Sequence, residues 1–214
     1  MEIQQKAVLN GLTAMQRFLN QHSRTMAPLN QSPVRAALDE LLRGVAAQEA
    51  TKHAAKLRQP SRLERLSELR ATFLSAHVRP IVRLGRKRAA KAPMLDCLRN
   101  PACDSTSDDL VSAAAEIGTI VGPHREIFLS EGFPDDFLDQ MAAAGEAVLT
   151  ATSEYFACRW DIDGAVAEIK RLICRGRALA RVLDTLALPL LEGNPKLAAE
   201  WRVTTSLRRR PESD

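Results

Sequence analysis

The chain has 214 residues, enough to bury a hydrophobic core, and we expect one domain over residues 1–206 with a disordered basic tail at 207–214. Aromatic residues make up only 4%, and alternating runs of β-branched residues are missing, which argues against β-sheet. The formal charge of +4 permits an anionic partner without requiring one. No stretch approaches ~18 uninterrupted apolar residues and no export leader is visible. We therefore expect no membrane partner and a cytoplasmic location.

In the first half of the chain, the spacing of apolar residues predicts three helices. The first covers residues 3–22. A serine followed by a proline at 32–33 is typical of a helix start and predicts a second helix, which fades near residue 57. Pro60 and Ser61 repeat that signal and predict a third helix over residues 61–91.

The second half begins with a predicted loop over residues 92–107, where Ser107 should cap the next helix. Glycine and proline at 132–134 end that helix, and a fifth follows to about residue 159. We expect Asp161 to start a sixth helix, which carries the longest apolar stripe in the chain. Gly193, Asn194 and Pro195 should stop it and cap a short last helix.

These elements predict an all-α fold, an up-and-down bundle of five to six main helices plus a short C-terminal helix. Pro80 and Pro123 interrupt apolar stripes instead of bounding them, so two of the helices should be kinked. We expect the two kinked helices to lie close together.

His77 and His124 sit beside these prolines, on the apolar stripes of their helices. One interpretation is structural, in which each ring donates to a carbonyl that a proline leaves free on a neighbouring helix. The alternatives are simple surface exposure or a polar pocket that binds a ligand or catalyses a reaction. That pocket would be formed by His77, Arg79, His124, Arg125 and Glu126.

Other chemistry finds little support in the sequence. A di-iron bundle needs Glu-x-x-His pairs, and none is present. There is no nucleophile elbow, phosphate-binding glycine loop or CxxC pair, and the four cysteines are most simply free thiols. We therefore expect no metal, no cofactor and no assigned catalytic residue.

Charge is segregated along the chain. A run of basic residues without any acid forms a candidate anion-binding surface: Arg79, Arg83, Arg86, Lys87, Arg88 and Lys91. Residues 104–146 are instead mostly acidic. The two segments could pair within the fold or between subunits, or the basic one could follow the phosphate backbone of a nucleic acid.

Three segments resemble uncharacterised all-helical bacterial proteins. They contain His77 to Ile81 (HVRPI), Pro123 with His124, and Leu197 to Arg202 (LAAEWR). The resemblance covers roughly residues 69–202. It implies a bacterial origin and a helical bundle, and it transfers no activity and no site residue.

These observations favour a non-enzymatic structural or protein-interaction bundle, acting through helix surfaces on another protein or on itself. The first alternative is a nucleic-acid-binding module that uses the basic helix end at residues 79–91. The second is a ligand-binding or catalytic bundle with its pocket at His77 and His124.

Overall fold

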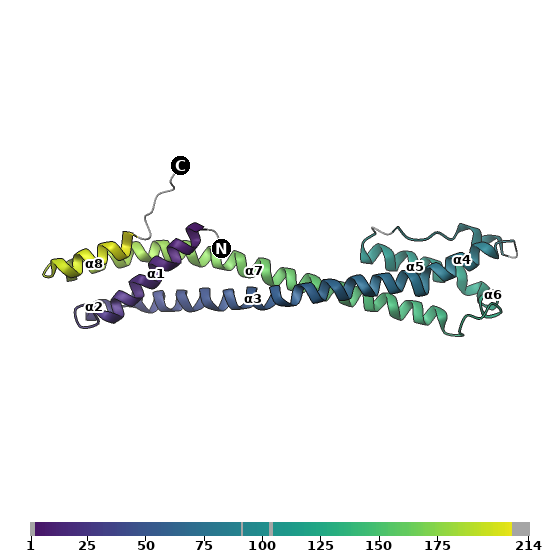
Figure 1. The fold of residues 1–214 in the computed structure, drawn as a ribbon, viewed down its shortest axis with the longest axis horizontal. Coiled ribbons are helices and arrows are strands. Elements are labelled where there is room, and N and C mark those ends of the chain that lie inside the picture. Colours follow the sequence, from purple (N-terminus) through teal and green to yellow (C-terminus); the bar gives the residue numbers. More distant parts are fainter. Residues whose placement is uncertain (1–2, 91, 103–104, 207–214) are drawn as a thin grey trace, which may run out of the picture. The chain divides into compact units, whose positions relative to one another are not determined.

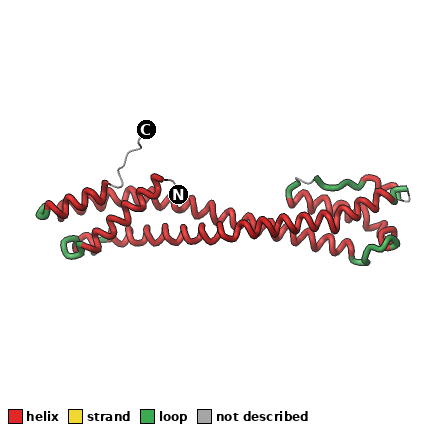
Figure 2. Tube along the Cα trace, viewed as in Figure 1, coloured by secondary structure: helices red, strands yellow, loops and turns green. Residues whose placement is uncertain are grey.

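The computed structural model describes residues 3–90, 92–102 and 105–206. Those residues form helices joined by turns, with no strand among them, so the all-α class is confirmed (Figure 2). The sequence suggested one domain over residues 1–206, whereas the chain falls into two compact units. Unit 1 combines Met1–Ala54 with Asp161–Asp214, and unit 2 is Ala55–Trp160. The predicted tail at 207–214 lies outside the described residues.

Figure 1 labels the α-helices in chain order. Three short segments with other hydrogen-bond patterns, η1 to η3, lie between them. The bounds are α1 (Ile3–Gln21), α2 (Ala27–Asn30), α3 (Pro33–Thr72), the π-helix η1 (Phe73–Val78), α4 (Arg79–Lys87), the 3₁₀ helix η2 (Pro93–Cys97), α5 (Ser107–Val121), the 3₁₀ helix η3 (Gly122–His124), α6 (Arg125–Leu129), α7 (Phe137–Leu191) and α8 (Pro195–Ser206).

Two predicted helix boundaries are wrong. Pro60 lies inside α3, and Asp161 lies inside α7, so the predicted second and third helices merge, as do the fifth and sixth. Pro60 is exposed, which lets water satisfy the carbonyl that its missing N–H leaves free. No helix-breaking proline lies near Asp161, and the single Gly164 nearby costs only about 1 kcal/mol in a helix, so α7 continues through both residues.

Two of three predicted helix caps are confirmed. Ser32 precedes α3 and its hydroxyl accepts from Arg35 N at 3.4 Å, while Asn194 caps α8 by accepting from Leu197 N at 3.2 Å. At α5 the prediction is off by one residue. Thr106 is the cap, accepting from Asp109 N at 3.2 Å, and this leaves Ser107 free for other contacts.

Pro80 and Pro123 both lie where the α-helical path changes. The π-helix η1 ends just before Pro80, and Arg79 N donates to the carbonyl five residues back, at Leu74. This wider turn relieves the clash between a proline ring and the carbonyl four residues earlier. Pro123 lies instead in η3, a 3₁₀ turn that separates α5 from α6.

The core of unit 1 is organised around Trp201 of α8. Its side chain is fully buried, its indole N–H donates to Asp184 of α7 at 3.0 Å, and its ring meets Phe18 of α1 at a centroid distance of 5.1 Å. Where α1 meets α7, Gly176 has no side chain, and a Cβ there would come within 2.6 Å of the Leu12 side chain. The buried Trp201 ring and the close approach of Leu12 to Gly176 thus both lie at contacts between these three helices.

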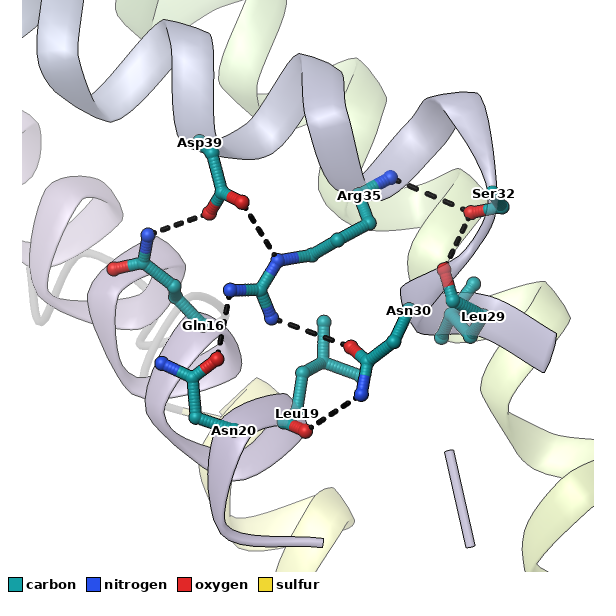
Figure 3. A network of polar contacts seen from close by, with 8 residues as sticks. All are labelled: Gln16, Leu19, Asn20, Leu29, Asn30, Ser32, Arg35 and Asp39. Atoms are coloured by element: carbon teal, nitrogen blue, oxygen red, sulfur yellow. Dashed lines mark hydrogen bonds and ion pairs between the residues drawn. The ribbon is translucent and has the colours of Figure 1, made fainter. Parts of the chain in front are cut away.

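A polar network joins α1, α2 and α3 at the edge of this core (Figure 3). Gln16 donates to Asp39 at 2.6 Å, and Arg35 donates to Asp39 at 3.0 Å and to Asn20 at 2.8 Å. Asn30 extends the network by donating to the Leu19 carbonyl at 2.9 Å. Burial alone would raise the pKa of Asp39, but the hydrogen bonds from Arg35 and Gln16 outweigh it and lower the pKa below its ordinary value.

We expect Trp201→Ala to lower the free energy of unfolding by about 3–5 kcal/mol, because it removes a large buried ring. Trp201→Phe keeps an aromatic ring but loses the bond to Asp184, and should cost less. Urea unfolding followed by circular dichroism measures both. Equal stability of Trp201→Ala and the wild type would contradict this packing.

The lowered pKa of Asp39 sets the direction of a pH effect. The ionised carboxylate is favoured in the folded state, so its contribution is present above the unfolded pKa and is lost as the pH falls through the folded pKa. Because 36% of the side chain is exposed, screening should keep that contribution near ~0.2–1 kcal/mol. Thermal unfolding of the wild type and Asp39→Asn should therefore differ near neutral pH and converge in acid. A stability difference that grows in acid would rule this out.

Candidate functional site

The two predicted histidines lie in different elements of unit 2. His77 is half-buried in η1, with its ring 6.5 Å from that of Phe73. His124 is half-buried in η3. Among the described residues, no hydrogen bond, ion pair or ring contact joins the two rings, and neither ring has a hydrogen-bond partner.

The other members of the predicted polar pocket lie in different environments. Arg125 donates to the backbone carbonyl of Asp135, which ties α6 to the turn before α7. Glu126 is exposed in the first turn of α6, and Arg79 is exposed on α4. A shared pocket at His77 and His124 therefore stays a prediction.

The basic run forms the outward face and the end of α4. Ile81, Val82 and Gly85 are buried, and the exposed positions between them carry cations: Arg79, Arg83, Arg86 and Lys87. Arg88 forms an ion pair with Glu131, which is one case of the predicted pairing between the basic and acidic segments. Lys91 lies outside the described residues.

In unit 2, helix α5 packs on the antiparallel pair formed by α3 and α7. Arg62 of α3 forms an ion pair with Glu154 of α7, and further along Phe73 lies against Gly145, so the two helices run antiparallel here (Figure 1). Val111 of α5 also lies against Gly145. Helix α5 thus covers one side of the α3–α7 pair.

Helix α5 begins at Ser107, whose side chain is buried between the two long helices. Arg70 of α3 donates to Ser107 Oγ at 3.1 Å, and the Thr152 hydroxyl of α7 lies 2.8 Å from the same oxygen. Arg70 also donates to the Ser105 carbonyl. One hydroxyl therefore holds the start of α5 on both long helices.

Beyond Ser107 the same side of the pair carries exposed apolar residues. Phe156 follows Thr152 by one helical turn and lies near its face of α7. Trp160 follows Phe156 by one more turn, and the two rings are neighbours. Leu63 precedes Arg70 by two turns and shares its face of α3. We call Leu63, Phe156 and Trp160 the apolar face; their exposed fractions are 50%, 41% and 69%.

Two cations border the apolar face. Lys56 lies two turns before Leu63 on α3, and Arg159 lies two turns after Thr152 on α7, so helical periodicity places both on the same side. Both are exposed, and neither forms an ion pair within the described chain. Lys56 and Arg159 thus place two positive charges beside the apolar face.

Sequence reasoning missed this surface because it followed the apolar stripes that build the core. The buried side of α7 here includes Ala151 and Cys158, whereas Phe156 and Trp160 lie off that stripe. Two aromatic residues one turn apart and outside the core stripe are the signal that could have identified it. Their rings are 6.3 Å apart.

Comparison with protein-family models, with curated proteins and with solved structures finds no match to this chain. The resemblance to bacterial helical proteins therefore stays a prediction. Within the described residues, no helix has the length and apolar character needed to cross a membrane.

The apolar face can be checked through its tryptophan. The chain has two tryptophans, Trp160, which is 69% exposed, and Trp201, which is fully buried. We expect Trp160→Phe to remove the fluorescence component that acrylamide quenches readily and to leave a shielded one. If the variant retains most of the quenchable emission, Trp160 is covered in solution.

Proposed function

We propose that this protein is an interaction protein, and that it binds an amphipathic helix of a partner along the apolar face. The observation that carries the proposal is the continuity between α5 and this face. Helix α5 covers the α3–α7 pair as far as Ser107, and the next turns present Leu63, Phe156 and Trp160 to solvent. Exposed apolar side chains on two antiparallel helices form a surface against which a third helix can pack.

The exposed rings explain why such a partner would bind. Burying a large apolar side chain contributes roughly 1.5–3 kcal/mol, and tryptophan is among the residues that dominate binding energies at interfaces. Trp160 exposes 69% of its surface and Phe156 is its neighbour. Together they supply an exposed aromatic anchor on the apolar face.

Charge specifies the partner further. Lys56 and Arg159 border the apolar face without carboxylate partners in the described chain. A helix with aspartate or glutamate beside its apolar stripe would complement them, and a basic helix would be repelled. The proposed partner is therefore an acidic amphipathic helix.

A cytoplasmic location belongs to the same proposal. Cys97, Cys158 and Cys174 are free thiols, and Cys97 and Cys174 are exposed. Exposed thiols persist in a reducing compartment. Cys103 lies outside the described residues.

A synthetic peptide tests the proposal. The probe is a fluorescein-labelled helical peptide with leucines along one face and glutamates beside them, titrated with the protein and followed by anisotropy. We expect Phe156→Ser with Trp160→Ser to weaken binding about tenfold or more, because both rings lose their burial. The matched control is Val182→Ser with Leu186→Ser, which removes two exposed apolar residues elsewhere on α7 and should leave binding unchanged.

Charge reversal separates this interface from general stickiness. Lys56→Glu with Arg159→Glu should weaken binding of the glutamate peptide. The same double variant should bind more tightly to a matched peptide in which lysines replace the glutamates. Equal binding of both peptides would refute the proposed charge specificity. Sedimentation velocity provides the remaining outcome: a dimer of the wild type that Trp160→Ser disrupts would show that a second copy covers the apolar face.

A further inference from the structure

The basic side of α4 carries several positive charges that no carboxylate balances within the described residues. Arg35, Arg62, Arg88 and Arg171 each form an ion pair with a carboxylate. Arg83, Arg86 and Lys87 of α4 and the nearby Arg99 form none within the described residues. We call these four residues the cation cluster.

Two members of the cation cluster converge on one atom. Arg86 Nε donates to the Leu98 carbonyl oxygen at 2.7 Å, and Arg99 Nη1 donates to the same oxygen at 3.0 Å. Arg99 Nη1 also donates to the Asp96 carbonyl at 2.6 Å. Neutral carbonyl acceptors therefore hold two guanidinium groups side by side, and their positive charges remain.

The shared carbonyl is itself fixed by packing. The Leu98 side chain is buried, and it lies so close to Gly85 of α4 that a Cβ at that position would collide with it. Gly85 leaves the room that the Leu98 side chain occupies against α4. The cation cluster is thus positioned by the fold before any ligand arrives, which reduces the ordering cost of binding.

The arrangement leaves the phosphate-binding side of Arg86 available. Its Nε is the atom bonded to Leu98, so the two terminal nitrogens are not used in that bond, and within the described residues they form no ion pair with a carboxylate. The edge formed by these two nitrogens matches two oxygens of one phosphate. Arg83 and Lys87 extend the cations along the helix, so the surface suits a ligand with several phosphates in sequence.

We propose that the cation cluster binds the phosphodiester backbone of a nucleic acid duplex, without reading its sequence. Backbone recognition is favoured over base stacking because Met94 is the single exposed large apolar side chain among the described residues 79–99, and no exposed aromatic ring lies there. This function is independent of the partner helix at the apolar face. It uses other residues of unit 2.

A short fluorescein-labelled DNA duplex, titrated by anisotropy over a range of salt, tests the proposal. We expect the logarithm of the binding constant to fall with log salt with a slope of about −3 to −4, because three to four phosphates would be neutralised. Arg86→Ala with Arg99→Ala should reduce the magnitude of the slope by about 2 and weaken binding about a hundredfold at ~50 mM salt.

Two further variants control for charge and for position. Arg175→Ala with Arg177→Ala removes the same charge from exposed sites on α7 and should leave the affinity within about twofold of wild type. Gly85→Ala changes no charge but displaces Leu98, and it should weaken duplex binding. Circular dichroism confirms that each variant is folded. Unchanged binding by Gly85→Ala would overturn the role of the shared carbonyl.

The ligand class is tested by competition. Inorganic polyphosphate and vesicles of anionic phospholipid are compared with the duplex at equal phosphate concentration. Stronger displacement by the duplex supports the proposal. Preference for polyphosphate or for vesicles overturns it, as does a double variant of Arg86 and Arg99 that binds duplex as tightly as the wild type.

Discussion

The extent of the apolar face in unit 2 depends on where α5 begins, and the buried Ser107 hydroxyl holds that end of α5 in place. A hydroxyl has few hydrogen-bonding positions, and this one meets Arg70 of α3 and Thr152 of α7. A buried polar group without partners would cost about 1–3 kcal/mol, so the three side chains stabilise one register of α5 on the α3–α7 pair. Beyond this point α5 no longer covers the pair, and Leu63, Phe156 and Trp160 are exposed.

This constraint explains why aromatic residues of one helix have different environments. Phe137 is buried at the start of α7, where it stacks on Phe128 at 5.5 Å, while Phe156 and Trp160 lie in the same helix and are exposed. Residue type alone does not distinguish them. The difference arises because α5 and α6 cover one stretch of α7 and not the next.

Much of the fold could be predicted from the sequence because its signals are local. Apolar periodicity predicted the all-α class, and side-chain caps at Ser32 and Asn194 marked true helix starts. The errors at Pro60 and Asp161 arose where a local stop signal competed with the packing of a long helix. An exposed proline costs a helix one hydrogen bond, and tertiary packing of the flanking turns outweighs that cost.

The candidate sites were harder to predict because they depend on contacts between distant residues. The basic run on α4 was visible in the sequence, but the carbonyl that joins Arg86 to Arg99 was not. The sequence also did not reveal that Arg88 forms an ion pair with Glu131, whereas Arg86 and Lys87 form none within the described residues. The histidines drew attention because prolines adjoin them, yet η1 accommodates Pro80 through the backbone, without a hydrogen bond from His77.

The acceptor of each arginine decides what that arginine can do. In unit 1 the charge of Arg35 is balanced by Asp39, and the same contact lowers the pKa of Asp39, so the pair stabilises the fold and leaves little charge for a partner. In unit 2 the acceptor of Arg86 is a carbonyl, which fixes the side chain and neutralises nothing. A carboxylate at that position would hold the guanidinium equally well and remove its attraction for an anion. The combination of a fixed position and an unbalanced charge is what distinguishes a binding surface from a structural salt bridge.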